Sequence, residues 1–231
     1  MGKEPKPPLR MLVTAGPTHE PIDAVRYLAN RSSGRMGMAI AQAAASRGTP
    51  CTLLLGPTPL NSPVHSQIQA VRFQSTADLE VLLRRHWPDH DVLVMAAAVA
   101  DFRPANAKSG EKIKRTSAGM TLELEATPDL LAGIAPFTRP NQLVVGFALE
   151  PADRLISSAM DKLTRKKMDA IVANPLETMD SPDVRATVMF RNGSAGSPSR
   201  IDLPPMSKEL FATWLVDRVL RIAGGQQAMN G

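Results

Sequence analysis

This sequence predicts an α/β fold in which a mostly parallel sheet is flanked by helices. Short apolar runs alternate with stretches of helical periodicity over most of the 231 residues, an order typical of parallel strands joined by right-handed crossovers. Hydrophobic residues make up 43% and charged residues 21% of the chain, which is the composition of a globular protein with a sizeable core. We therefore expect a flexible leader over residues 1–9, a single domain over 10–225 and a tail over 226–231.

The expected strands are short apolar runs bounded by turn signals. They cover residues 11–15, 51–55, 70–74, 91–97, 142–148 and 169–173. Ser33 is expected to cap a helix that runs to Arg47, with Gly48 as its C-terminal stop. Ser75 and Asp78 form the start signal of a second helix, which Pro88 ends.

The second half of the chain follows the same logic with more antiparallel character. Residues 120–125 alternate apolar and polar side chains, which predicts a half-exposed strand, and the pattern turns helical after Pro128. Residues 185–204 read as two strands joined by a Gly/Ser loop. The closing helix, over 207–224, is expected to face the core with Leu210, Phe211, Trp214 and Leu215.

Charge and cysteine content narrow the classes of partner. The net charge is +5, and only residues 108–115 and 162–167 are dense in lysine and arginine, which favours a small anionic ligand over nucleic acid. Cys51 is the single cysteine, so no intrachain disulfide can form, and its apolar surroundings favour a buried strand residue over a nucleophile. The N-terminus has no apolar signal segment and no long apolar run follows. We expect a cytoplasmic protein with no membrane partner.

The stretch SSGRMG, residues 32–37, follows the first expected strand. Two hydroxyls and a glycine lead into a helix start, where free N–H groups and the helix dipole favour a phosphate. The structural alternative is that Gly37 only lets the helix lie close on the sheet. No complete G-x-G-x-x-G is present, and the second strand ends without an acidic residue, so a dinucleotide site lacks its two best supports.

Three other stretches could carry chemistry. AAAVADFRP delivers Asp101 to the carboxyl end of an expected strand, although this stretch alone fits a helix-capping or loop aspartate better. Residues 103–119 are expected to form a long loop. Within it Lys112 and Lys114 lie on either side of Ile113, so both ammonium groups could point to one side, and the loop is either a cationic lid or a solvent-exposed surface loop. Lys162 and Lys166 share one helix face, which alone usually indicates only a solvated surface.

Metal-binding patterns are nearly lacking in this sequence. His86 and His90 have the spacing of a helical ligand pair, but Pro88 between them breaks the helix that would align them. We therefore expect no metal held by protein side chains, and chemistry that rests on positioning, phosphate binding and lysine electrostatics.

Taken together, five motifs resemble phosphopantothenoylcysteine synthetase, the ligase domain of bacterial coenzyme A biosynthesis. They are VTAGPTHEPIDAVRYLANRSSGRMG, AAAVADFRP, EKIKR, VVGFALE and KLTRKKMDAIVANP, in the family's order, and the resemblance runs from about Arg10 to about Ala223. It implies a Rossmann-like domain with a small β-rich dimerisation and lid region, and a homodimer. It also implies CTP as co-substrate and Mg²⁺ as cofactor, with 4′-phosphopantothenate activated to an acyl cytidylate that L-cysteine captures.

The resemblance also implies roles for individual residues. Asn30 matches the asparagine that holds the acyl phosphate centre, Arg26 a nearby arginine of that motif, and Lys112 the lid lysine of the second step. The implied nucleotide and phosphate contacts are Ser32, Ser33, Gly34, Gly37, Ala98, Ala100, Asp101, Phe147, Lys162 and Lys166. Ala98 and Ala100 are expected to offer backbone groups to the cytosine.

Two departures and two rival functions accompany this resemblance. Leu149 and Pro151 replace the family's usual residues, and the flavin-dependent decarboxylase half of many bacterial versions is missing, which implies a separate decarboxylase. The main rival is an NAD(P)-dependent short-chain reductase, but Tyr27, the only tyrosine, is followed four residues later by Arg31 rather than lysine. A nucleic-acid-binding module lacks interleaved aromatic residues.

Overall fold

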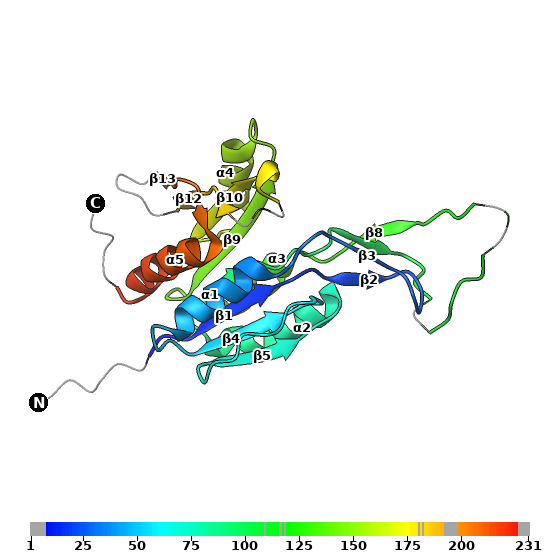
Figure 1. Ribbon diagram of the computed structural model, residues 1–231, viewed down its shortest axis with the longest axis horizontal. Coiled ribbons are helices and arrows are strands. Elements are labelled where there is room, and N and C mark those ends of the chain that lie inside the picture. Colours follow the sequence, from blue (N-terminus) through cyan, green and yellow to red (C-terminus); the bar gives the residue numbers. More distant parts are fainter. Residues whose placement is uncertain are drawn as a thin grey trace, which may run out of the picture.

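The computed structural model describes residues 8–225 except 109, 116, 118, 180, 182 and 192–197. Its centre is an eight-stranded sheet in the order β13-β12-β10-β9-β6-β1-β4-β5 (Figure 1). These strands are β1 (Met11–Ala15), β4 (Cys51–Leu55), β5 (Ile68–Arg72), β6 (Val92–Met95), β9 (Leu143–Glu150), β10 (Ala170–Pro175), β12 (Thr187–Phe190) and β13 (Ser199–Asp202). The strands from β10 to β5 pair in parallel, and β12 and β13 continue the sheet antiparallel. The predicted mostly parallel α/β fold is confirmed.

Helices cover both faces of this sheet. α1 (Arg35–Ala45) and α5 (Lys208–Ala223) pack over one face, while α2 (Thr76–His86), α3 (Leu130–Ile134) and α4 (Leu155–Arg165) pack over the other (Figure 1). Successive side chains of a strand point to opposite faces, so Val13 of β1 joins the core beneath α1 and Leu12 joins the other core. Short 3₁₀ turns and a small strand pair complete the fold: η1 (Trp87–Asp89), η2 (Ala135–Phe137), η3 (Leu176–Thr178), β11 (Asp183–Val184) and β14 (Met206–Ser207).

Several strand boundaries differ from the prediction. β5 covers residues 68–72 instead of 70–74, because its register places Ile68 opposite Cys51. β6 ends at Met95, before the expected residue 97. β9 and β10 each run two residues further than expected, because they stay paired as far as Glu150 and Pro175. Register with the neighbouring strand, which the sequence does not display, decides each of these ends.

Two helix predictions are wrong in detail and one is confirmed. Ser33 is not the N-cap of α1, because the helix begins after Gly34, whose φ of 75° lies in the left-handed region that favours glycine. Leu210 does not face the core and is 58% exposed, because the buried stripe of α5 runs through Phe211 and Leu215. The capping box at Ser75, predicted for α2, is present.

A two-ribbon extension projects from the carboxyl edge of the sheet (Figure 1). It consists of the antiparallel pairs β2 (His19–Pro21) with β3 (Tyr27–Ala29) and β7 (Phe102–Pro104) with β8 (Leu124–Ala126). We call the described residues within 19–29 and 102–126 the arm. Of the strand expected over 120–125, only β8 forms. All three of its residues are exposed, because the two-stranded ribbon does not pack on the core. The hairpin of β2 and β3 was not predicted.

Two further features bear on the sequence analysis: the burial of Cys51 and the character of the helices. Cys51 is buried, as predicted, and burial raises the pKa of its thiol to about 12. Within the described ranges, no helix has the length and apolar character needed to cross a lipid bilayer.

His90 gives the fold an expected dependence on pH. Its Nδ1 lies 2.6 Å from the carbonyl oxygen of His86, and its Nε2 lies 2.9 Å from Oγ1 of Thr52. A neutral ring with its proton on Nδ1 satisfies both contacts. Burial lowers the pKa of His90 below 6.5, and burial likewise lowers the pKa values of His86 and His19.

Stability is therefore expected to fall as the pH drops below the histidine value of the unfolded chain. The unfolded chain then binds protons that the folded chain does not, so the free energy of unfolding decreases from pH 6.5 downward, whereas the contribution of the neutral histidine is fully present above this pH. Urea unfolding at about pH 7.5 and about pH 5.5 measures the difference, and His90→Gln should reduce it. An identical difference in wild type and variant would contradict this role of His90.

Candidate active site

A cleft of about 930 Å³ opens at the carboxyl ends of the central parallel strands. From β1 the chain builds outward to β4 and β5 in one direction, and then through β6 to β9 and β10 in the other. The point where the direction reverses, between β1 and β6, is where open α/β sheets bind ligands. All predicted site residues line this cleft except Arg26 and Lys112.

The N-terminus of α1 forms one wall of the cleft. The hydroxyl oxygens of Ser32 and Ser33 accept hydrogen bonds from the amides of Gly34 (3.3 Å) and Arg35 (3.5 Å). The next two amides, of residues 36 and 37, have no hydrogen-bond partner within the described part of the chain. Open amides at the positive end of a helix dipole suit an anionic group such as a phosphate.

Gly37 lets α1 approach β1 so closely that a larger residue has no room. A Cβ at this position would lie 2.5 Å from Cβ of Ala15 and 2.8 Å from the carbonyl oxygen of Thr14. We expect Gly37→Ala to lower the free energy of unfolding by about 1–3 kcal/mol, because α1 must move off the sheet. Urea unfolding measures it, with the exposed α1 substitution Gln42→Ala as control, and equal stability of both variants would contradict this account.

The loop that follows β6 forms the opposite wall and is anchored to the body of the protein. The amide of Ala98 donates to the carbonyl oxygen of Gly16 (2.9 Å), and the amide of Ala100 donates to Oγ1 of Thr18 (3.0 Å). The carbonyl oxygens of Ala98 and Ala100 accept from the amide of Thr18 (3.2 Å) and Oγ1 of Thr127 (2.6 Å). The amide hydrogens of both alanines are thus used inside the chain, and only the second lone pairs of their carbonyls remain for a ligand.

Asn30 connects the two walls. Its Nδ2 donates to the carbonyl oxygen of Val99 at 2.8 Å, while the rest of the exposed amide borders the cleft. In the described part of the chain, the amide of Val99 itself has no partner. A neutral donor therefore stands between the open amides of α1 and the anchored loop, in a place suited to an oxygen that gains negative charge.

Lysines from α4 and its C-terminus form the third side of the cleft. Nζ of Lys162 pairs with Glu150 at 2.5 Å, and Nζ of Lys166 pairs with Asp129 at 3.2 Å. The hydrogen bond from Lys162 lowers the pKa of Glu150. Burial would raise the pKa of Asp129, but hydrogen bonds from the α3 backbone and the charge of Lys166 outweigh it and lower the pKa. Both lysines are held in place by carboxylates.

The charge of the lining is predominantly positive. Its acidic side chains are Asp101 and Asp129. Its basic side chains are Arg31, Arg35, Lys162, Arg165, Lys166 and Lys208. This balance favours an anionic ligand, in agreement with the prediction from the charge pattern.

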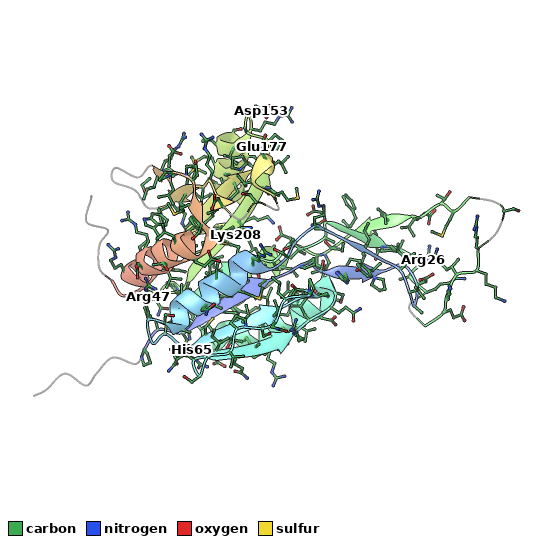
Figure 2. All side chains as sticks on the ribbon, viewed as in Figure 1. Arg26, Arg47, His65, Asp153, Glu177 and Lys208 are labelled. Carbon is green, nitrogen blue, oxygen red and sulfur yellow. The ribbon has the colours of Figure 1, made fainter. Side chains whose placement is uncertain are left out.

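Arg26 and Lys112 lie apart from the other predicted residues. Both belong to the arm, and Figure 2 shows Arg26 far out along it, well away from Lys208 beside the cleft. Arg26 forms an ion pair with Asp23 and donates to the carbonyl oxygen of Ile113 (3.2 Å), the neighbour of Lys112. The cleft of one chain is therefore lined without these two side chains.

Many lining residues were not predicted. Among them are Asn174, Thr178, Met179 and Lys208, which lie together at one end of the cleft. Oδ1 of Asn174 is buried without a hydrogen-bond partner among the described residues. Asn174 lies near the carboxyl end of the parallel strand β10, and Asp101 lies beyond the carboxyl end of β6, so the strand-end rule that found Asp101 could have found Asn174.

Metal ligands are sparse. Over the described ranges, no group of three or more His, Cys, Asp or Glu side chains is placed to hold a metal ion. The donor set thus offers no metal cage of its own, and a hard cation would need ligands from a bound phosphate compound.

Comparison with known proteins gives consistent matches over most of the chain. The family model described as DNA/pantothenate metabolism flavoprotein C-terminal domain matches residues 8–222. A cysteine/cysteine sulfinic acid decarboxylase from an unknown prokaryotic organism is 45% identical over 168 residues, 73% of this chain and 46% of that protein. The coenzyme A biosynthesis bifunctional protein CoaBC of Mycobacterium tuberculosis (strain ATCC 25618 / H37Rv) is 38% identical over 225 residues, 94% of this chain and 53% of that protein.

A solved structure matches over nearly its full length. The crystal structure of the C-terminal domain of coenzyme A biosynthesis bifunctional protein CoaBC is 32% identical with a TM-score of 0.77, covering 94% of this chain and 96% of that one. The chain spans about half the length of the curated relatives it matches. Their names describe whole proteins, so they do not by themselves assign an activity to the matched half.

Proposed function

Since this chain belongs to the DNA/pantothenate metabolism flavoprotein C-terminal domain family, as its motifs predicted, we propose that it ligates 4′-phosphopantothenate to L-cysteine in coenzyme A biosynthesis. In the first step a carboxylate oxygen of 4′-phosphopantothenate attacks the α-phosphorus of CTP, and pyrophosphate leaves. In the second step the amine of cysteine attacks the acyl carbon of the acyl cytidylate, CMP leaves with the bonding electron pair, and the amine loses a proton.

The observation that carries this proposal is the position of Asn30 between two differently built walls. On one side, the unpartnered amides at the start of α1, with Ser32 and Ser33, suit the phosphates of a nucleotide. On the other side, the anchored loop ending in Asp101 suits a nucleoside. Asn30 would then lie at the acyl phosphate centre, where its Nδ2 stabilises the charge that develops on oxygen.

The base and the leaving group would be bound by neighbouring residues. Because the amides of Ala98 and Ala100 are already used, we assign the cytosine to the carbonyl oxygens of these residues and to the amide of Val99. A carbonyl acceptor suits the cytosine N4 amine as a donor. Phe147 would pack on the nucleoside, and Lys162 and Lys166 would exchange their carboxylate partners for phosphate oxygens.

The arm supports the proposal of a homodimer. It carries Arg26 away from the cleft of its own chain (Figure 2), and Arg26 is hydrogen-bonded to Ile113, the neighbour of Lys112. Neither Arg26 nor Lys112 lines that cleft, so these residues would serve the cleft of a second copy. Exposed apolar side chains on the arm, including Val25 (62%), Tyr27 (54%) and Phe102 (54%), suit burial in such a contact. The dimer would thus complete two identical sites.

Magnesium would enter with the nucleotide. The described side chains offer no three-ligand metal site, whereas Mg²⁺ commonly binds through substrate phosphates and keeps several waters. The ion would supply neutralisation of the triphosphate charge. The steps assigned to this chain's own residues are binding, orientation and stabilisation of charge.

A direct assay tests the function. The purified protein is incubated with 4′-phosphopantothenate, Mg²⁺ and either CTP or ATP, with and without L-cysteine, and mass spectrometry follows nucleoside monophosphate and adduct. CMP and adduct appearing together are expected, and turnover with ATP alone would overturn the choice of CTP. No turnover together with NAD(P)H binding would favour the rival reductase. Such a reductase requires a catalytic tyrosine, and Tyr27, the single tyrosine of the sequence, lies exposed on the arm.

A further inference from the structure

Asp23 is a buried carboxylate on the arm that the proposed reaction does not use. The residue is 3% exposed, and its side chain has no exposed surface at all. Its Oδ1 accepts hydrogen bonds from the amides of Val25 (2.9 Å) and Arg26 (2.8 Å). Its Oδ2 accepts from the guanidinium of Arg26, with Nε at 3.0 Å. Burying a charged carboxylate is costly unless hydrogen-bond donors surround it, and these contacts supply the donors.

The same carboxylate reaches across to the segment that carries Lys112. The amide of Ile113 donates to Oδ2 of Asp23 at 3.1 Å, and the carbonyl oxygen of Ile113 accepts from the guanidinium of Arg26 at 3.2 Å. Asp23 and Arg26 therefore hold the Ile113 residue by both its N–H and its C=O. We call Asp23, Arg26 and the backbone of Ile113 the clasp.

Backbone hydrogen bonds continue the connection on the N-terminal side of Lys112. The amide of Ala24 donates to the carbonyl oxygen of Glu111 at 3.0 Å, and the amide of Lys108 donates to that of Ile22 at 3.1 Å. Lys112 is thus flanked by two residues that are both fixed to the turn between β2 and β3. Residues 110–115 form no helix or strand, so these contacts decide where the lysine lies.

We propose that Asp23 is a positioning residue for Lys112: by holding the backbone of Ile113, it sets the place of the Lys112 ammonium group in the capture of the acyl nucleotide by the amine. This inference rests on the proposed function. Asp23 itself touches no substrate in the proposal and acts through the clasp alone.

The clasp depends on the negative charge of Asp23. The hydrogen bond from Arg26 holds the pKa of this carboxyl well below its usual range, so that it is ionised at every pH at which the protein would work. Asparagine keeps the shape of the side chain but has one acceptor oxygen and an NH₂ group that would face the donors of Arg26 and Ile113. Asp23→Asn therefore opens the clasp with little change in volume.

The kinetic test separates the two steps. We expect Asp23→Asn to slow the capture of the acyl cytidylate by about 10- to 100-fold, because a small misplacement of a reacting group has effects of that size. Release of pyrophosphate in the absence of cysteine should stay within about twofold of wild type. Combining Asp23→Asn with Lys112→Gln should slow capture no further than Lys112→Gln alone, because both act through one group.

A matched control is available on the same arm. Glu125 pairs with Arg103 at 2.8 Å across β7 and β8 but does not contact residues 108–113 in the described hydrogen bonds. Glu125→Gln makes the same chemical change, loss of one carboxylate paired with arginine, and should leave the capture step unchanged. Equal slowing by Asp23→Asn and Glu125→Gln, or additive effects of Asp23→Asn and Lys112→Gln, would overturn the proposal.

Hydrogen exchange gives a readout that needs no activity. The amide of Ile113 should exchange about tenfold faster in Asp23→Asn than in wild type, since a hydrogen bond to a charged group is lost, whereas core amides of β1 should be unchanged. Unaltered exchange at Ile113 rules out the clasp even if the ligase activity is established. Conversely, if the wild-type protein has no ligase activity but Ile113 exchanges faster in Asp23→Asn, the clasp is confirmed and its role in this reaction is refuted.

Discussion

Asn30→Asp is expected to form the acyl nucleotide about 10²- to 10³-fold more slowly than wild type, the usual cost of losing one donor at a developing oxyanion. Nδ2 of Asn30 donates to the carbonyl oxygen of Val99 at 2.8 Å, and a carboxylate cannot do so. The new negative charge would also repel both this carbonyl and the phosphates in the cleft. Pyrophosphate release from CTP and 4′-phosphopantothenate without cysteine measures this step alone.

Asn141→Asp provides the control for this substitution. Asn141 is an exposed residue outside the cleft lining, so the same change in charge there should leave pyrophosphate release unaltered. Because Asn30 is also exposed, the unfolding midpoints of both variants should stay close to that of wild type. A folded Asn30→Asp protein that releases pyrophosphate at the wild-type rate would remove Asn30 from the proposed mechanism.

Much of the fold follows from periodicity and caps. The buried parallel strands β1 and β4 have the predicted bounds because an apolar run flanked by turn residues has few alternatives. The capping box at Ser75 and Asp78 was likewise readable, because it depends on residues three positions apart. Local signals of this kind reach across one turn of helix or one strand.

Features that depend on distant pairing could not be read in the same way. The hairpin of β2 and β3 contains only three residues in each strand and buries little, so it has no hydrophobic pattern. The start of α1 depends on a positive φ at Gly34, and serine at position 33 is an equally good cap by composition. Leu210 is one position away from the buried stripe of α5, an error in helical phase that packing alone resolves.

The candidate site shows the same division. Residues at strand ends and at the start of α1 meet in one cleft, as the topology of a parallel sheet requires. Arg26 stands only four residues before Asn30 in the sequence, yet it lies on the arm outside this cleft. The role of Asp23 had no sequence signal, because its partner Ile113 is distant in the chain. Motif spacing therefore indicates which residues are candidates for one reaction but not whether they line the same cleft of the chain.

Lys112→Gln is expected to slow the second step by about 10²-fold while leaving the first nearly intact, so that acyl cytidylate accumulates when cysteine is present. The ammonium group of Lys112 would neutralise the phosphate of the leaving CMP, and the part of the arm around Lys112 would exclude water from the intermediate. Glutamine retains most of the length but not the charge. Quenched-flow mass spectrometry of the acyl cytidylate measures the accumulation.

Lys108→Gln is the matched control, since Lys108 is an exposed lysine of the same arm whose side chain has no part in the proposed site. It should capture cysteine at the wild-type rate with no accumulation. If Lys108→Gln and Lys112→Gln behave alike, the effect belongs to the charge of the arm as a whole, and the specific role of Lys112 is refuted.

Mixing two inactive variants tests where Lys112 acts. Consider a mixed dimer of one Asn30→Asp chain and one Lys112→Gln chain in which each cleft is served by the partner's arm. One of its two clefts then combines a native Asn30 with a native Lys112. Random exchange of subunits would therefore restore about a quarter of the wild-type sites. An arm that folds back on its own chain would restore none, because every cleft would then carry one of the two substitutions. Since Arg26 of the arm lies well away from Lys208 beside the cleft of its own chain (Figure 2), we expect the activity to return.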